Sequence, residues 1–129
     1  MKTGIKGSIE IVVTDQMTAG MIGSGELDVL ATPALIAIAE ETAWKSVAAE
    51  LDEGQGTVGI RMELSHIAAT PVGMKVRCET ELIEIDRRKL TFTIAAYDDK
   101  EKIAEGVHER FIVDNERFQE KADQKIADH

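Results

Sequence analysis

The sequence contains one cysteine, few basic residues and no long apolar run. Cys78 cannot form an internal disulfide, and a single thiol in 129 residues favours a reducing compartment. The longest apolar stretch, residues 30–39, contains Thr32 and Pro33 and is too short to cross a bilayer. The N-terminus lacks an apolar run followed by a small-residue cleavage site, so no signal peptide is predicted. We therefore expect a cytoplasmic protein that does not associate with membranes.

Positive charge is scarce, with 15 basic residues against 24 acidic ones and a formal net charge of −9. Non-specific binding to nucleic acid needs a basic surface, so no nucleic-acid partner is expected. The basic cluster at residues 87–89 either binds ligand phosphates, together with Lys102, or forms an ordinary solvated turn. A hydrophobic content of 43% in 129 residues predicts a single folded domain over residues 1–129.

One segment has the composition and boundaries of a long helix. Thr32 is a good N-cap, Pro33 is favoured at the first helical position, and residues 34–51 are rich in Ala, Leu, Ile and Glu before Gly54. Residues 15–30, with glycines at 20, 23 and 25, predict a loop with a short helical turn. Residues 115–129 form a charged tail, predicted as a short helix or a frayed end.

The remaining segments predict strands. Residues 8–14 are rich in β-branched side chains, and residues 58–66, 74–82, 90–96 and 103–113 include runs of alternating apolar and polar positions. Turns at residues 70–73, 86–89 and 98–100 predict that the four strands from residue 58 onward form an antiparallel meander. A curved sheet can bury the apolar stripe of the helix, so the fold class is α+β.

Glu40 is the first candidate for chemistry, because it lies on the helix face that carries Ile36 and Trp44. A desolvated carboxylate there has a raised pKa and can act as a base. The alternative is a partly buried face on which Glu40 is solvated. Glu41, four residues before Lys45, is predicted to form an ion pair on the solvent side.

Thr32 and two histidines are further candidates. Thr32 is either only the helix N-cap or also part of an oxyanion site at the helix N-terminus, and the two roles are compatible. His66 follows the apolar positions Val58, Ile60, Met62 and Leu64, as a core residue or a proton-transfer group. His108 is predicted to be a strand residue held by its neighbours.

Several chemistries find no support in the sequence. There is no glycine-rich phosphate loop, because residues 20–25 lack the flanking strand and helix. One cysteine and three scattered histidines give no metal-ligand spacing, so no metal is expected. No Gly-x-Ser-x-Gly motif is present.

Several motifs together resemble the fluoroacetyl-CoA thioesterase family, a branch of the hotdog thioesterases, over residues 9–118. They are Ala-Thr-Pro at 31–33, Ala-Glu-Glu-Thr-Ala-Trp at 39–44, Gly-Thr-Val-Gly at 56–59, Ser-His-Ile-Ala-Ala-Thr-Pro-Val-Gly at 65–73, and His-Glu-Arg at 108–110. The resemblance implies a hotdog fold, a five-stranded antiparallel sheet wrapped around one long central helix. It also implies a homodimer with sites at the subunit interface, and leaves open whether dimers pair into tetramers.

The resemblance further implies that Thr32, Glu40 and His66 are catalytic. Gly59 would place its backbone beside the thioester, and Arg110 would belong to the substrate-binding group. Coenzyme A would be part of the substrate, with no separate cofactor. Glu40 would act as a base on water or as a nucleophile, while His66 would stabilise or protonate developing charge.

The family's fluoroacetyl-specific enzyme has an aromatic lid just before the catalytic threonine. Residues 23–30 contain no aromatic side chain here, so we expect a short-chain or other small acyl-CoA substrate instead. A non-catalytic acyl-CoA sensor is the alternative function, since a fold does not determine an activity. Hydration of enoyl-CoA has less support, because the hydratases that share this fold carry an Asp/His pair on one loop and no such pair occurs in this sequence.

Overall fold

The computed structural model describes residues 1–127, so the last two residues of the predicted tail lie outside the described part. The strands are β1 (Lys6–Val12), β2 (Gln55–His66), β3 (Lys75–Asp86), β4 (Lys89–Asp98) and β5 (Lys102–Asp114). The helices are α1 (Ala19–Ile22), α2 (Thr32–Val47) and α3 (Asn115–Ala127), with short 3-10 turns η1 (Asp15–Met17) and η2 (Ala48–Glu50). The predicted helical turn in the loop and the predicted helix in the tail are both present.

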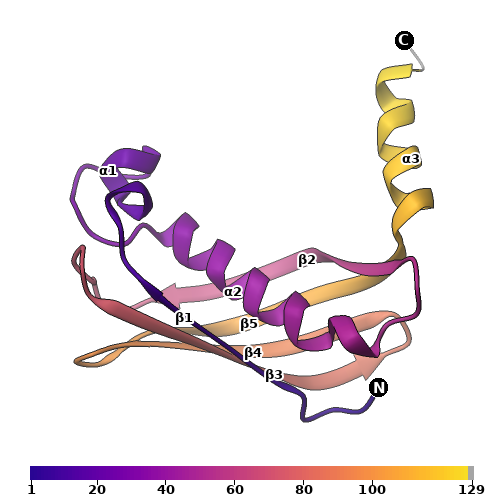
Figure 1. The fold of residues 1–129 in the computed structure, drawn as a ribbon, viewed down its shortest axis with the longest axis horizontal. Helices are drawn as coiled ribbons and strands as arrows, with labels where there is room; N and C mark the ends of the chain where they lie inside the picture. Colours follow the sequence, from indigo (N-terminus) through magenta and orange to yellow (C-terminus); the bar gives the residue numbers. More distant parts are fainter. Residues whose placement is uncertain (128–129) are drawn as a thin grey trace.

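The five strands form one antiparallel sheet in the order β1-β3-β4-β5-β2, and α2 lies across one of its faces (Figure 1). This is the predicted α+β arrangement of a sheet around a long helix. Strands β3, β4 and β5 form a meander, but the prediction that β2 precedes them within it is wrong. Strand β1 pairs with the outer edge of β3, so β2 pairs with β5 at the opposite edge.

The core lies between α2 and the sheet. Alternate residues of β3 and β4 point toward the helix and are buried, as their period-two pattern predicts. Phe92 and Leu82 pack beneath the C-terminal half of α2 against Ala43 and Val47. Cys78 and Ile94 pack beneath its middle against Ile38. The helix is therefore held on a rigid surface that fixes the positions of its other side chains.

Strand β2 contains a bulge that the sequence pattern does not reveal. Gly59 pairs with Arg110 but Arg61 pairs with Glu109, so Ile60 is the extra residue and lies 51% exposed. The bulge reverses which residues face α2. Met62 packs toward the helix with Leu64 and His66 after it, whereas before the bulge it is Gly59, not Val58, that faces α2. The predicted shared face for Val58 and His66 is therefore wrong.

Helix α3 projects away from the end of β5 and buries none of its residues (Figure 1). Asp114 accepts a hydrogen bond from the Arg117 backbone N–H at 3.2 Å and so caps its first turn. Within residues 1–127, no helix has the length and apolar composition needed to cross a membrane.

Candidate active site

Helix α2 begins one residue earlier than predicted, and this frees the Thr32 hydroxyl. Backbone bonds from Ala31 to Met17 O (2.8 Å) and from Leu30 to Thr70 O (2.9 Å) hold the chain extended up to residue 31. Ala31 is consequently the N-cap, and the prediction that Thr32 is the N-cap is wrong. The Thr32 Oγ1 instead lies 2.8 Å from His66 Nδ1, which brings two predicted site residues together.

His66 is held neutral by its surroundings. Burial lowers the pKa of its imidazole, and the nearby Ala68 backbone only partly offsets this effect. Its Nε2 is buried and has no hydrogen-bond partner in the described part of the chain. Because buried polar atoms are normally paired, a ligand or a second subunit is expected to reach this atom.

A cavity of about 300 Å³ opens beside Thr32 and His66. Its other lining residues come from the 15–31 loop and from the segment after β2, and most are small. They are Ala19, Ser24, Val29, Leu30, Ala31, Ile67, Ala68 and Ala69. The cavity therefore offers space for a small organic group next to a hydroxyl and a neutral imidazole.

Glu40, Gly59 and Arg110 form a second cluster. The buried Arg110 donates from Nη1 to Glu40 Oε2 at 3.2 Å. It also donates to Thr57, from Nε to the side-chain hydroxyl at 2.8 Å and from Nη2 to the backbone oxygen at 2.9 Å. A Cβ atom at position 59 would overlap Glu40 Oε2 and approach Arg110 Nη1 to 3.3 Å. Glycine is therefore needed for the carboxylate to lie against β2.

The expected desolvation of Glu40 is not found in the single chain. Its side chain is 42% exposed, because neighbouring Trp44 (43%) and Ile60 (51%) are themselves uncovered. The predicted Glu41–Lys45 ion pair is present on the solvent side of α2.

The two clusters are separate within one chain. Thr32 and Glu40 stand eight residues apart on α2, a rise of about 12 Å along the helix axis. Among residues 1–127, no hydrogen bond or ion pair joins Thr32 or His66 to Glu40 or Arg110. The structure thus assembles two parts of the predicted site along the α2–β2 boundary without bringing them into contact.

Two residues around Arg110 were missed as members of the site. Thr57 supplies two of its acceptors, and the predicted strand residue His108 supplies a third, with Nε2 at 3.0 Å from Nη1. An arginine at an inward-facing strand position needs hydrogen-bond acceptors beside it. The position of Arg110 in the sequence could therefore have indicated that acceptors lie near it. A glycine within a strand, such as Gly59 in β2, likewise indicates that another group approaches the backbone closely.

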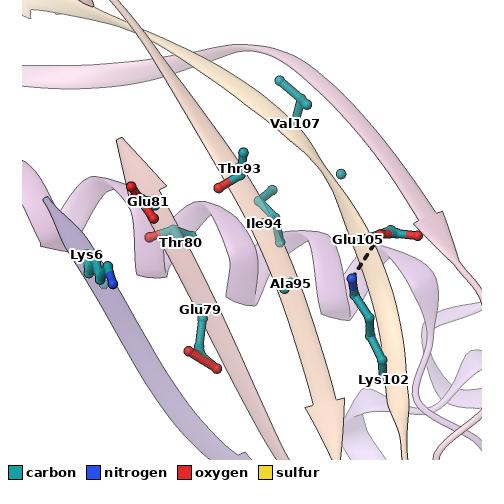
Figure 2. Close-up of a pocket in the computed structure, with 12 residues that line it drawn as sticks. Lys6, Glu79, Thr80, Glu81, Thr93, Ile94, Ala95, Lys102, Glu105 and Val107 are labelled. Atoms are coloured by element: carbon teal, nitrogen blue, oxygen red, sulfur yellow. Dashed lines mark hydrogen bonds and ion pairs between the residues drawn. The ribbon is translucent and has the colours of Figure 1, made fainter. Parts of the chain in front are cut away.

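Other surfaces carry less chemistry. A depression of about 540 Å³ lies on the sheet face opposite α2, where Lys102 pairs with Glu105 at 2.9 Å (Figure 2). The basic cluster occupies the β3–β4 turn and borders a hollow of about 480 Å³ with Phe111. No group of three or more metal-ligating side chains occurs within residues 1–127.

Comparison with known proteins decides the family. A family model described as fluoroacetyl-CoA-specific thioesterase matches residues 13–116. The chain belongs to this family. It is 33% identical over 98 residues to the fluoroacetyl-CoA thioesterase of Streptantibioticus cattleyicolor, covering 76% of this chain and 70% of that protein.

Solved structures agree with this assignment. A variant of the fluoroacetyl-CoA-specific thioesterase superposes with a TM-score of 0.91 at 28% identity, covering 97% of each chain. The same variant in complex with fluoroacetate and CoA gives a TM-score of 0.87 at 27% identity, over 92% of this chain and 99% of that one. A thioesterase superfamily member from Thermus thermophilus, 23% identical, gives 0.89 over 99% and 97% and shows the shared fold. The resemblance seen in the sequence, the hotdog fold and the assignment to acyl-CoA thioesterases are confirmed.

Proposed function

We propose that the protein hydrolyses a short or small acyl-CoA thioester to the free acid and CoA. The observation that carries the proposal is the pairing of Thr32 with His66 and of Glu40 with Gly59 along one helix–strand boundary. Family membership supports the reaction class, and a relative's complex with fluoroacetate and CoA supports a CoA ester as the ligand. No cofactor besides the CoA of the substrate is included in the proposal.

In this mechanism, the thioester carbonyl lies near the Thr32 hydroxyl and the Gly59 backbone. The first turn of α2 has free backbone N–H groups, which favour the developing oxyanion. Glu40 takes a proton from the attacking water, or attacks the carbonyl itself. The C–S bond then breaks, and the CoA thiolate receives a proton with His66 as the nearby donor or relay. On the route in which Glu40 attacks, water then hydrolyses the acyl–Glu40 anhydride, which releases the free acid and restores the carboxylate. Arg110 holds Glu40 from the strand side and belongs to the substrate-binding group.

The acyl group is proposed to be small without being restricted to fluoroacetyl. The lid segment at residues 23–30 contains no aromatic side chain. Ser24 and the alanines line the cavity beside Thr32 where bulky rings would restrict it. These features support a site that accepts acetyl and somewhat larger acyl groups.

A homodimer is part of the proposal. Strand β2 is an edge of the sheet and carries the half-exposed Ile60, while Glu40 and Trp44 on α2 are half-exposed as well. A twofold contact along this edge would cover these side chains and carry Thr32 and His66 of one subunit toward Glu40 of the other. Exposed Ile83 and Val107 on the opposite sheet face are where dimers would pair into a tetramer. The buried, unpaired Cys78 thiol supports a cytoplasmic location.

The function is tested by thiol release from acetyl-, butyryl-, phenylacetyl- and fluoroacetyl-CoA, comparing the wild type with Glu40→Ala. We expect turnover of at least one ester, lost in the variant by a factor of about 10² or more. Saturable binding of CoA esters without any turnover would contradict hydrolysis and favour a non-catalytic acyl-CoA sensor.

A further inference from the structure

His108 is a buried histidine whose hydrogen bonds determine where its proton lies. Its side chain is 1% exposed, and its ring lies beside Phe92 with centroids 6.3 Å apart. Nδ1 is 2.8 Å from the Arg61 backbone oxygen, which only accepts, so Nδ1 carries the proton. Nε2 is 3.0 Å from Arg110 Nη1, and a guanidinium only donates, so Nε2 is an unprotonated acceptor. The ring is therefore a neutral imidazole in one defined tautomer.

Arg110 connects this imidazole to Glu40 through a single nitrogen. Its Nη1 donates both to His108 Nε2 and to Glu40 Oε2, at 3.0 and 3.2 Å. Its Nε and Nη2 are occupied by Thr57. Of these partners, only Glu40 has a half-exposed side chain that can rotate. The orientation of Arg110 Nη1 therefore determines the position of the Glu40 carboxylate.

We propose that His108 is a positioning residue: as a neutral acceptor it fixes Arg110 Nη1, and through it the Glu40 carboxylate. This role rests on the proposed function of Glu40 in thioester hydrolysis. It assigns to the first residue of the His-Glu-Arg motif a part in the reaction, although its ring is buried away from the Thr32 cavity.

Protonation of His108 would reverse these contacts. A proton on His108 Nε2 would point at the Arg110 cation. The protonated Nε2 would then donate toward Glu40 Oε2, which lies 4.0 Å from it. The charged groups around the ring are Arg110 and Glu109 on β5 and Glu40 on α2, while β2 contributes the Arg61 carbonyl and β4 the Phe92 ring. Burial has the largest effect on the pKa of His108 and lowers it, and Arg110 acts in the same direction. The Arg61 carbonyl and the two carboxylates raise the pKa but do not reverse the shift, so the neutral form persists at neutral pH.

The experiment compares two substitutions. His108→Phe keeps a ring against Phe92 but removes the acceptor, whereas His108→Gln retains an acceptor that can reach Arg110. We expect kcat to fall on the order of tenfold to a hundredfold in His108→Phe with KM changed less than about threefold, and His108→Gln to recover most of kcat. A purely structural role would instead lower the folded fraction of both variants and leave kcat per folded molecule unchanged.

Nitrogen-15 NMR of the wild type gives a readout that needs no substrate. The His108 signal, assigned by its loss in His108→Gln, is expected to show the Nδ1–H neutral tautomer at about pH 6.5. An Nε2–H tautomer or an imidazolium there would overturn the proposal, even if His108→Phe does not fold. If the wild type is active and a folded His108→Phe variant has the same kcat, the positioning role of His108 is overturned while the proposed function stands. An inactive wild type would overturn the proposed function and, with it, any role of His108 in the reaction.

Discussion

Replacing Gly59 by alanine separates the effect of the site on catalysis from its effect on stability. The added methyl group would occupy the space now filled by Glu40 Oε2, and its other close neighbours, Arg110 Nη1 and His108 Cε1, would lie at 3.3 Å. Glu40 is the flexible member of this group, because its side chain is 42% exposed. The carboxylate therefore moves and the fold is retained.

The expected change in stability is small. Glu40 would lose its contact with Arg110. This loss is worth about 0.5–1 kcal/mol, because the carboxylate is half-exposed and the buried guanidinium keeps its hydrogen bonds to Thr57 and His108. Alanine is favoured over glycine within a strand by roughly 0.5–1 kcal/mol, which offsets the loss. We therefore expect the melting temperature of Gly59→Ala to stay within about 5 °C of the wild type. Catalysis should respond strongly, because displacing a reacting group by about 1 Å costs on the order of 10²-fold.

The assay is thiol release on the best acyl-CoA substrate, with melting measured on the same preparations. Gly56→Ala is the matched control. Gly56 lies on β2 like Gly59, but a Cβ atom there would meet the exposed side chain of Asn115, at the start of α3, and not Glu40. The control should keep both its stability and its activity. If Gly59→Ala keeps more than about a third of the wild-type rate, the close contact between Glu40 and β2 is not part of the mechanism.

Four further predictions follow from the same geometry. Thr32→Val should lower kcat about 10–100-fold while Thr32→Ser retains most of it, as thiol release will measure. Burial lowers the pKa values of His66 and His108, so their contribution to the unfolding free energy should be constant above about pH 6.5. Below that pH it should fall by at most about 1.4 kcal/mol per pH unit for each histidine, and urea titrations of His66→Gln should show a smaller decline. If the proposed dimer forms along β2, Trp44→Glu should give a monomer in sedimentation and lower turnover in parallel. Ser24→Phe, which fills the cavity beside Thr32, should reduce turnover of butyryl-CoA more than that of acetyl-CoA.

Much of the fold could be predicted because it depends on local patterns. One face is buried from residue 76 to residue 82 of β3 and from residue 90 to residue 96 of β4, so the alternation of residues such as Val76, Cys78 and Phe92 matches the burial observed. The long helix was predicted from its composition and its Thr-Pro start. Thr32, Glu40 and His66 were candidates from their positions and were assigned catalytic roles by the family resemblance; in the structure Thr32 pairs with His66, and the three roles stay a prediction.

The errors arose where distant segments determine the local structure. The bulge at Ile60 is defined by pairing with β5, which lies more than forty residues later, so no pattern within β2 reveals it. The N-cap moved to Ala31 because Met17 holds its backbone from another part of the loop. The acceptors of Arg110 come from β2 and β5 together, and their residue types alone do not indicate that they meet.

Subunit complementation tests the central claim most directly, that thioester hydrolysis occurs where Thr32 of one subunit meets Glu40 of the other. Thr32→Ala and Glu40→Ala chains carrying different affinity tags would be co-expressed, and only heterodimers would be purified and assayed for thiol release. Each homodimer should be nearly inactive, whereas the heterodimer should show about half of the wild-type rate, because one of its two sites contains both native residues. A heterodimer as inactive as the homodimers, beside an active wild type, would contradict the shared site.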